Sequence, residues 1–143
     1  MKHSGCVLAF TAQRNKELMT AYRNAILNAD YIDLSRVAYI IANTPTSRFW
    51  VSEERALIVV QAIMNGSPIL ETMRPLKREM FMEIYTRVRR LMKEKPDTPL
   101  PDIVMEVVNS PAPKFYLQDR CAMDIIYKIK SGFYDTRKTI LDK

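Results

Sequence analysis

The amino-acid sequence predicts an all-α protein with two tandem three-helix repeats packed into one body. Three observations predict it. Residues 43–63 and 109–129 superimpose without a gap at a constant step of 66 residues. Apolar residues recur at three- and four-residue steps, the period of a helix face, and do not alternate as they do in a half-buried strand. Only 3 Gly occur in 143 residues, of which 48% are hydrophobic, so the chain can bury a folded core.

The two copies keep the same residue types at equivalent positions. The pairs are Asn43 with Asn109, Pro45 with Pro111, Arg48 with Lys114, Phe49 with Phe115, Trp50 with Tyr116, Ala56 with Ala122 and Ile63 with Ile129. This agreement at one fixed spacing indicates an internal duplication. Each copy is small for an independent hydrophobic core, so we expect the two to pack together.

The first repeat is predicted at residues 14–66, after an N-terminal arm at residues 1–13. Apolar residues on one face predict its first helix at residues 14–28. A second helix is predicted at residues 34–42, because the side chain of Asp30 or Asp33 can accept a hydrogen bond from a backbone N–H of its first turn.

The third helix of this repeat is predicted at residues 52–64, where the Ser52 hydroxyl can cap the first turn. The loop before it carries Phe49 and Trp50. Aromatic residues that recur in a duplication usually lock a loop onto helices. We therefore expect the two phenylalanines of the repeats to be buried, and Trp50 and its equivalent to be half exposed.

A linker is predicted at residues 67–75, where Pro68 and Pro75 interrupt regular structure. The second repeat follows at residues 76–132 and reproduces the three helices. Its first helix has the strongest apolar arc in the chain. The tail at residues 133–143 has no counterpart in the first repeat.

Composition and charge narrow the class of function. The formal net charge of +6 favours anionic partners. Cys6 and Cys121 do not make a disulfide framework, which indicates a reduced, cytoplasmic setting. No run of about 18 apolar residues predicts a membrane span, and the first residues are too short an apolar run for a secretory signal.

The residue types that catalysis needs are mostly missing. The only histidine is His3, in the predicted arm. No Gly-rich phosphate loop occurs, and no ligand pair has the spacing of a metal site. The sequence therefore predicts a non-enzymatic protein with no cofactor, no metal and no small-molecule substrate.

The apolar positions of each repeat form an ordered pattern. In the first repeat they are Leu34, Val37, Ala38, Ile41, Val51, Ala56 and either Val59 or Val60. In the second they are Leu100, Ile103, Val104, Val107, Leu117, Ala122 and either Ile125 or Ile126. The pattern resembles the apolar skeleton of helix-turn-helix domains.

That resemblance implies that the third helix of each repeat enters a DNA major groove by its first turns. The exposed positions of these helices are then the candidates for contacts with base edges, namely Arg55, Gln61, Arg120 and Lys128. Arg48 and Lys114 would contact the DNA backbone.

A further basic cluster lies on the first helix of the second repeat. Arg89, Arg90 and Lys93 lie away from its apolar arc and could face a phosphate backbone. Alternatively, this is a solvated face with ion pairs at the four-residue spacing, Glu83 with Arg87 and Arg90 with Glu94. The sequence leaves both interpretations open.

The leading hypothesis is a small cytoplasmic accessory or regulatory protein of a bacterium or a phage that binds double-stranded DNA. The alternative is a protein-interaction or structural module, which docks a partner, a second copy of the chain, or a virion or machine component through Trp50 and Tyr116. RNA binding is a third possibility, since it uses the same basic surface.

Overall fold

The structure, a computed structural model, describes the backbone of residues 2–132 and the side chains of residues 10–132. The predicted tail at residues 133–143 lies outside this range. The described chain is helical and contains no strand, which confirms the all-α prediction. Its elements are α1 (Lys2–Leu27), α2 (Leu34–Ala42), α3 (Glu53–Met64), the 3₁₀ turn η1 (Ile69–Thr72), α4 (Pro75–Glu94), α5 (Leu100–Val108) and α6 (Asp119–Lys130).

Two helices begin with a capping side chain that the sequence offered. The cap of α2 is Asp33, one of the two candidates Asp30 and Asp33, and the cap of α3 is Ser52. The Asp33 carboxylate accepts from the backbone N–H of Ser35 at 3.1 Å, and the Ser52 hydroxyl accepts from that of Arg55 at 3.0 Å. The predicted arm is different, because α1 begins at Lys2 and runs through it. No proline interrupts this stretch, and its one glycine, Gly5, costs roughly 1 kcal/mol relative to alanine.

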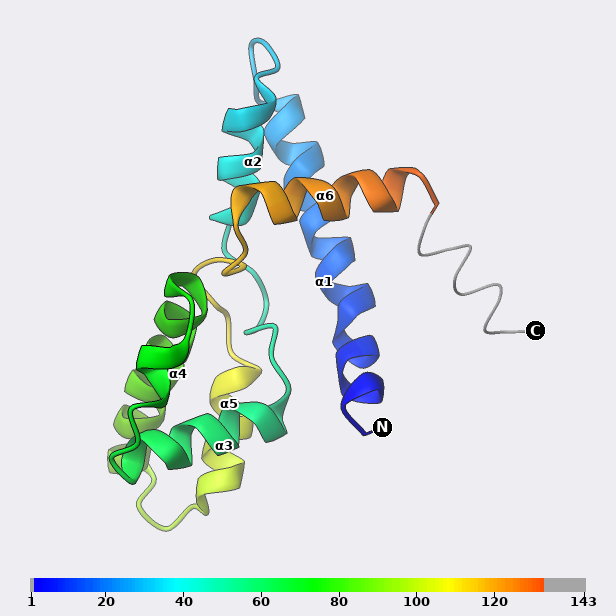
Figure 1. The fold of residues 1–143 in the computed structure, drawn as a ribbon. Coiled ribbons are helices and arrows are strands. Elements are labelled where there is room, and N and C mark those ends of the chain that lie inside the picture. Colours follow the sequence, from blue (N-terminus) through cyan, green and yellow to red (C-terminus); the bar gives the residue numbers. More distant parts are fainter. Residues whose placement is uncertain (1, 133–143) are drawn as a thin grey trace, which may run out of the picture.

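The helices group into two lobes that do not follow the order of the chain (Figure 1). Lobe 1 consists of α1, α2 and α6, and lobe 2 consists of α3, α4 and α5. The third helix of each predicted repeat therefore packs against the first two helices of the other repeat. The predicted repeats at residues 14–66 and 76–132 are thus units of sequence that do not coincide with the two lobes. The internal duplication remains a prediction.

This exchange changes how the helix-turn-helix pattern is used. In the described chain, α2 does not contact α3, and α5 does not contact α6. The apolar skeleton is buried, but α2 packs on α6 and α5 packs on α3. Consecutive helices thus do not form the packed pair that the resemblance implies, because each long connection carries the chain into the other lobe.

Two hydrophobic cores result, one in each lobe. The core of lobe 1 includes Leu18, Ile41, Phe115, Ala122 and Ile126, and that of lobe 2 includes Phe49, Phe81, Ile84, Ile103 and Val108. Phe49 is 0% exposed and Phe115 is 3% exposed, as predicted. Each phenylalanine belongs to the connection that leaves the opposite lobe, so both connections are fixed at the junction.

We call these connections the crossing segments, residues 43–52 and 109–118. They meet in one antiparallel bridge. The Thr46 N–H donates to the Ala112 carbonyl at 3.0 Å, and the Ala112 N–H donates to the Thr46 carbonyl at 2.9 Å. Beyond the bridge, the Phe49 N–H donates to the Val108 carbonyl at 3.0 Å, and the Phe115 N–H donates to that of Ala42 at 3.2 Å. The hydrogen bonds correspond pairwise at the 66-residue step, so the junction is twofold in its bonding.

Candidate nucleic-acid interface

The aromatic pairs of the crossing segments stack on each other across the junction. The Trp50 ring lies on Phe115 with 6.5 Å between ring centroids, and the Tyr116 ring lies on Phe49 at 6.0 Å. Trp50 Nε1 also donates to Thr46 Oγ1 at 3.0 Å. Trp50 and Tyr116 are half-buried, as predicted. They hold the two lobes together, and one face of each ring is already covered.

Tyr116 has an unusual backbone conformation and a raised pKa. Its φ is 58°, in the left-handed region that few residues with a side chain adopt. Burial, with the charges of Glu83 and Glu79 next in importance, raises the pKa of the phenol to about 12. Tyr116 therefore remains a neutral packing residue well into the alkaline range.

Arg48 makes its hydrogen bonds within the chain. Its guanidinium donates to the Phe49 carbonyl at 2.9 Å and to the Val51 carbonyl at 2.8 Å. It also lies over the rings of Phe10 and Trp50. Burial lowers the pKa of Arg48, and the nearby carboxylate of Glu53 partly opposes the change. The structure thus places this predicted DNA-backbone contact in the packing of the junction.

Lys114, the equivalent of Arg48, is also engaged. Its Nζ lies 2.7 Å from Glu79 Oε1 on α4 and 5.6 Å from the centroid of the Tyr116 ring. A phosphate could bind this ammonium only in competition with the carboxylate. Neither predicted cation of the crossing segments is available without loss of a contact inside the chain.

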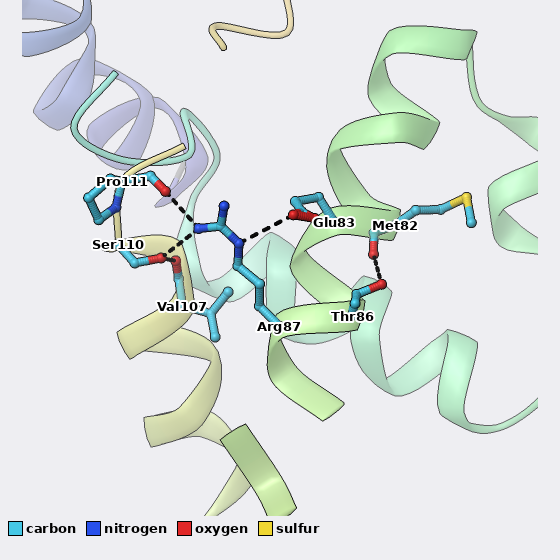
Figure 2. Close-up of polar contacts among 7 residues, drawn as sticks. All are labelled: Met82, Glu83, Thr86, Arg87, Val107, Ser110 and Pro111. Carbon is cyan, nitrogen blue, oxygen red and sulfur yellow. Dashed lines mark hydrogen bonds and ion pairs between the residues drawn. The ribbon is translucent and has the colours of Figure 1, made fainter. Parts of the chain in front are cut away.

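Arg87 on α4 anchors the second crossing segment and was not predicted to do so (Figure 2). Its Nη1 donates to the Pro111 carbonyl at 2.6 Å and to Ser110 Oγ at 3.2 Å, while Nε pairs with Glu83 at 3.5 Å. The guanidinium also lies 5.0 Å from the centroid of the Phe49 ring. One side chain thus ties α4 to both crossing segments.

Glu17 on α1 plays the matching part for the first crossing segment. Its carboxylate accepts from Thr46 Oγ1 at 2.7 Å, from the Ser47 N–H at 2.8 Å and from the Ser47 hydroxyl. Burial raises its pKa, but these hydrogen bonds together with one from Gln13 outweigh burial and leave the pKa of Glu17 below its usual value. Partners about 30 positions away leave no periodic signal, so the sequence did not reveal this anchor.

The basic cluster of α4 keeps its charges exposed. None of the side-chain ion pairs between described residues includes Arg89, Arg90 or Lys93. The Glu83–Arg87 pair forms as the sequence allowed, but the Arg90–Glu94 pair does not. Arg89 donates to the Tyr85 hydroxyl at 3.4 Å. This helix therefore presents cations with no carboxylate partner in the described chain.

The base-edge candidates are exposed but are divided between the lobes. Arg55 and Gln61 lie on α3 in lobe 2, and Arg120 and Lys128 lie on α6 in lobe 1. Helix exchange causes this division. Arg55 and Arg120 are both in the first turn of their helices, where the crossing segments end, so these two lie near the junction.

An exposed apolar surface occurs where α1 turns into α2. Its members are Leu27, Tyr31, Ile32 and Leu34, which are 81%, 77%, 60% and 49% exposed. We call this surface the apolar tip. Leu34 was expected on the buried stripe of its helix but lies outside the core, because the stripe is buried only from Val37 onward. The tip projects from the end of lobe 1 that is remote from lobe 2 (Figure 1).

Comparisons of the chain with protein-family models, curated proteins and solved structures find no match. Within the described residues, no group of three or more His, Cys, Asp or Glu side chains is placed to hold a metal ion. No helix in that range combines the length and apolar character needed to cross a membrane. Cys121 is exposed and is not in a disulfide.

Proposed function

We propose that the protein is a cytoplasmic accessory or regulatory protein that binds the backbone of double-stranded DNA with little sequence preference. The observation that carries the proposal is the exposed cluster of Arg89, Arg90 and Lys93 without carboxylate partners. Cations that are not neutralised within the chain can displace the counterions of DNA, and that release drives sequence-independent binding.

The exposed residues of α3 and α6 support backbone binding better than base reading. Arg55 and Arg120 are exposed cations, but their helices are not the second members of packed consecutive pairs. The acids Glu53, Glu54 and Asp119 also stand in the first turns of these helices. Insertion of either turn into a groove would bring these acids close to the phosphates on both sides of it, where charges of the same sign repel. We propose phosphate contacts and no fixed base contacts.

A titration of labelled duplex at several salt concentrations tests the proposal. Because each neutralised phosphate contributes about 0.9 to the slope of log affinity against log salt, the Arg90→Ala/Lys93→Ala variant should lower that slope by about two. The matched control is Lys16→Ala/Arg23→Ala, which removes two exposed cations from α1. If the wild-type chain fails to bind duplex at low salt, the proposal is wrong.

Protein interaction is the second candidate, and the apolar tip favours it. Contiguous exposed apolar side chains are uncommon on monomers and usually mark a surface that another molecule covers. The corresponding turn of lobe 2, residues 95–99, carries lysine, proline, aspartate and threonine instead. The tip is therefore a property of lobe 1 alone and is not required by the architecture.

Mass measurement by light scattering over a range of concentrations tests the second candidate. We expect a mass above that of one chain at high concentration, and return to the monomer in the Leu27→Ser/Ile32→Ser variant, since about 2 kcal/mol of burial is lost for each exposed aliphatic side chain removed from an interface. A strict monomer at all concentrations would exclude self-association through the apolar tip, and any partner of this surface would then be a different protein.

A further inference from the structure

The two lobes leave a cleft between them, beside the start of α4. Its volume is about 590 Å³. One wall is the start of α4 with the residues just before it, the second is the end of the crossing segment that leads into α6, and the third is the first turn of α3. Helix exchange creates this place, because α3 and α6 both begin where the crossing segments end.

Three cations line the cleft. They are Arg55 from α3, Arg74 immediately before α4 and Lys77 in its first turn. All three are exposed, and none makes an ion pair or a side-chain hydrogen bond to a described residue. No acidic residue of the described chain is among the lining residues. Three like charges thus face one concave space without an anion.

Two neighbouring cations differ from the three in the cleft, because both are bonded within the chain. Arg78, one position beyond Lys77, donates to the carbonyls of Leu70 and Met73 at 2.9 and 3.0 Å. Lys114 in the crossing segment is paired with Glu79. Arg78 and Lys114 are therefore used to hold the chain, whereas the three cations in the cleft are not.

The backbone also contributes hydrogen-bond donors with partial positive charge to the cleft. Both α4 and α6 begin at the cleft, and neither has a side chain of the described chain capping its first turn. The first N–H groups of a helix have no partner within it, and they carry the positive end of the helix dipole. At α4 these donors are the N–H groups of Leu76 and Lys77, since Pro75 has none.

We propose that this cleft is a phosphate-binding site, with Arg55, Arg74 and Lys77 as the side chains that hold the anion. Guanidinium groups bind phosphate oxygens in a bidentate manner, the lysine adds a point charge, and the N–H groups of the helix starts complete the donor set. The phosphate belongs to a nucleic-acid backbone; this assignment of its source rests on the proposed function, whereas the site itself does not.

Two probes distinguish the existence of the phosphate-binding site from the source of the phosphate that binds there. Inorganic pyrophosphate, titrated at low salt and followed by changes in the backbone amide NMR signals, reports on the cleft alone. We expect shifts at Leu76, Lys77 and the first residues of α6, and affinity lowered about tenfold or more by Arg74→Ala/Lys77→Ala, because charge-assisted hydrogen bonds are lost. Lys16→Ala/Arg23→Ala is the charge-matched control and should bind pyrophosphate within about twofold of wild type.

Labelled duplex is the second probe. Loss of duplex affinity in Arg74→Ala/Lys77→Ala, with a salt slope smaller by about two, would support the nucleic-acid source. If pyrophosphate binding depends on the cleft and duplex does not bind at all, the site stands with a small phosphate as ligand and the proposed function fails. If duplex binds equally well to wild type and variant, and pyrophosphate gives no shifts at the cleft, the site is overturned while DNA binding elsewhere stands. Far-UV circular dichroism checks that the variants are folded.

Discussion

Neither half of the chain, residues 1–66 or residues 67–143, should fold as a monomer, and mixing the two should restore the native helix content. In residues 1–66, α1 and α2 lack α6, and α3 lacks α4 and α5, so no complete core is present. The expected loss is the whole stability of a domain, about 5–15 kcal/mol. Circular dichroism and size-exclusion chromatography of each half, then of the mixture, measure it.

The control for this experiment is the full folded chain cut once, at the peptide bond between Ser67 and Pro68, before η1 begins. That cut breaks no helix, so the two pieces should remain associated and native under conditions in which the isolated halves are unfolded. A monomeric, cooperatively folded 1–66 fragment would contradict the exchange of α3 and α6, since it would mean that three consecutive helices form a core by themselves.

The second large effect is expected from Phe49→Ala and Phe115→Ala. Each phenylalanine is essentially fully buried in the core of one lobe and is held in a crossing segment that leaves the other. Removing a buried phenylalanine ring leaves a cavity, and the free energy of unfolding should fall by about 3–5 kcal/mol in each variant. Phe49→Ala also removes the surface on which the Arg87 guanidinium lies.

Urea denaturation measures both changes as shifts of the midpoint at constant slope. Tyr39→Ala is a suitable control, because it also deletes an aromatic ring from a helix but at a position that is 60% exposed. Its effect should stay within about 0.5 kcal/mol. Losses below about 1 kcal/mol for Phe49→Ala and Phe115→Ala would show that the junction does not depend on these rings.

The helices were largely predictable, because burial follows a period that single residues record. Val37, Ile41, Ile103 and Val107 recur at helical spacing, and all four are buried. The start of α1 was not predictable by the same means, since residues 6–10 form a continuous apolar run without that period. Capping side chains identified the start of α3 and limited that of α2 to Asp30 or Asp33, because that contact is local.

The exchange of α3 and α6 was beyond the reach of the same patterns. The two helices present equivalent residues to their partners, as at Ala56 and Ala122, so an apolar stripe fits either pair of neighbours. The length of the crossing segments was the one available signal, since residues 43–52 are longer than the short turn of a packed helix pair.

The candidate site was predicted in part. The exposed cations on α3, α4 and α6 followed from their places outside the apolar arcs. The contacts of Arg48 and Lys114 did not, because a basic residue beside an aromatic has the same appearance whether it binds a ligand or the chain itself. Arg74 and Lys77 gain their interest only from the cleft, which forms between segments distant in the sequence.

The nesting of lobe 2 inside lobe 1 has a consequence for synthesis on the ribosome. Lobe 2 is continuous along the chain, from α3 to α5, whereas lobe 1 is built from the first two helices and the last. Since domains fold as units while the N-terminal part emerges first, lobe 2 can be complete while α1 and α2 still wait for α6. Throughout that interval the nascent chain exposes the apolar faces of α1 and α2, and transiently exposed apolar surface of this kind is prone to aggregation.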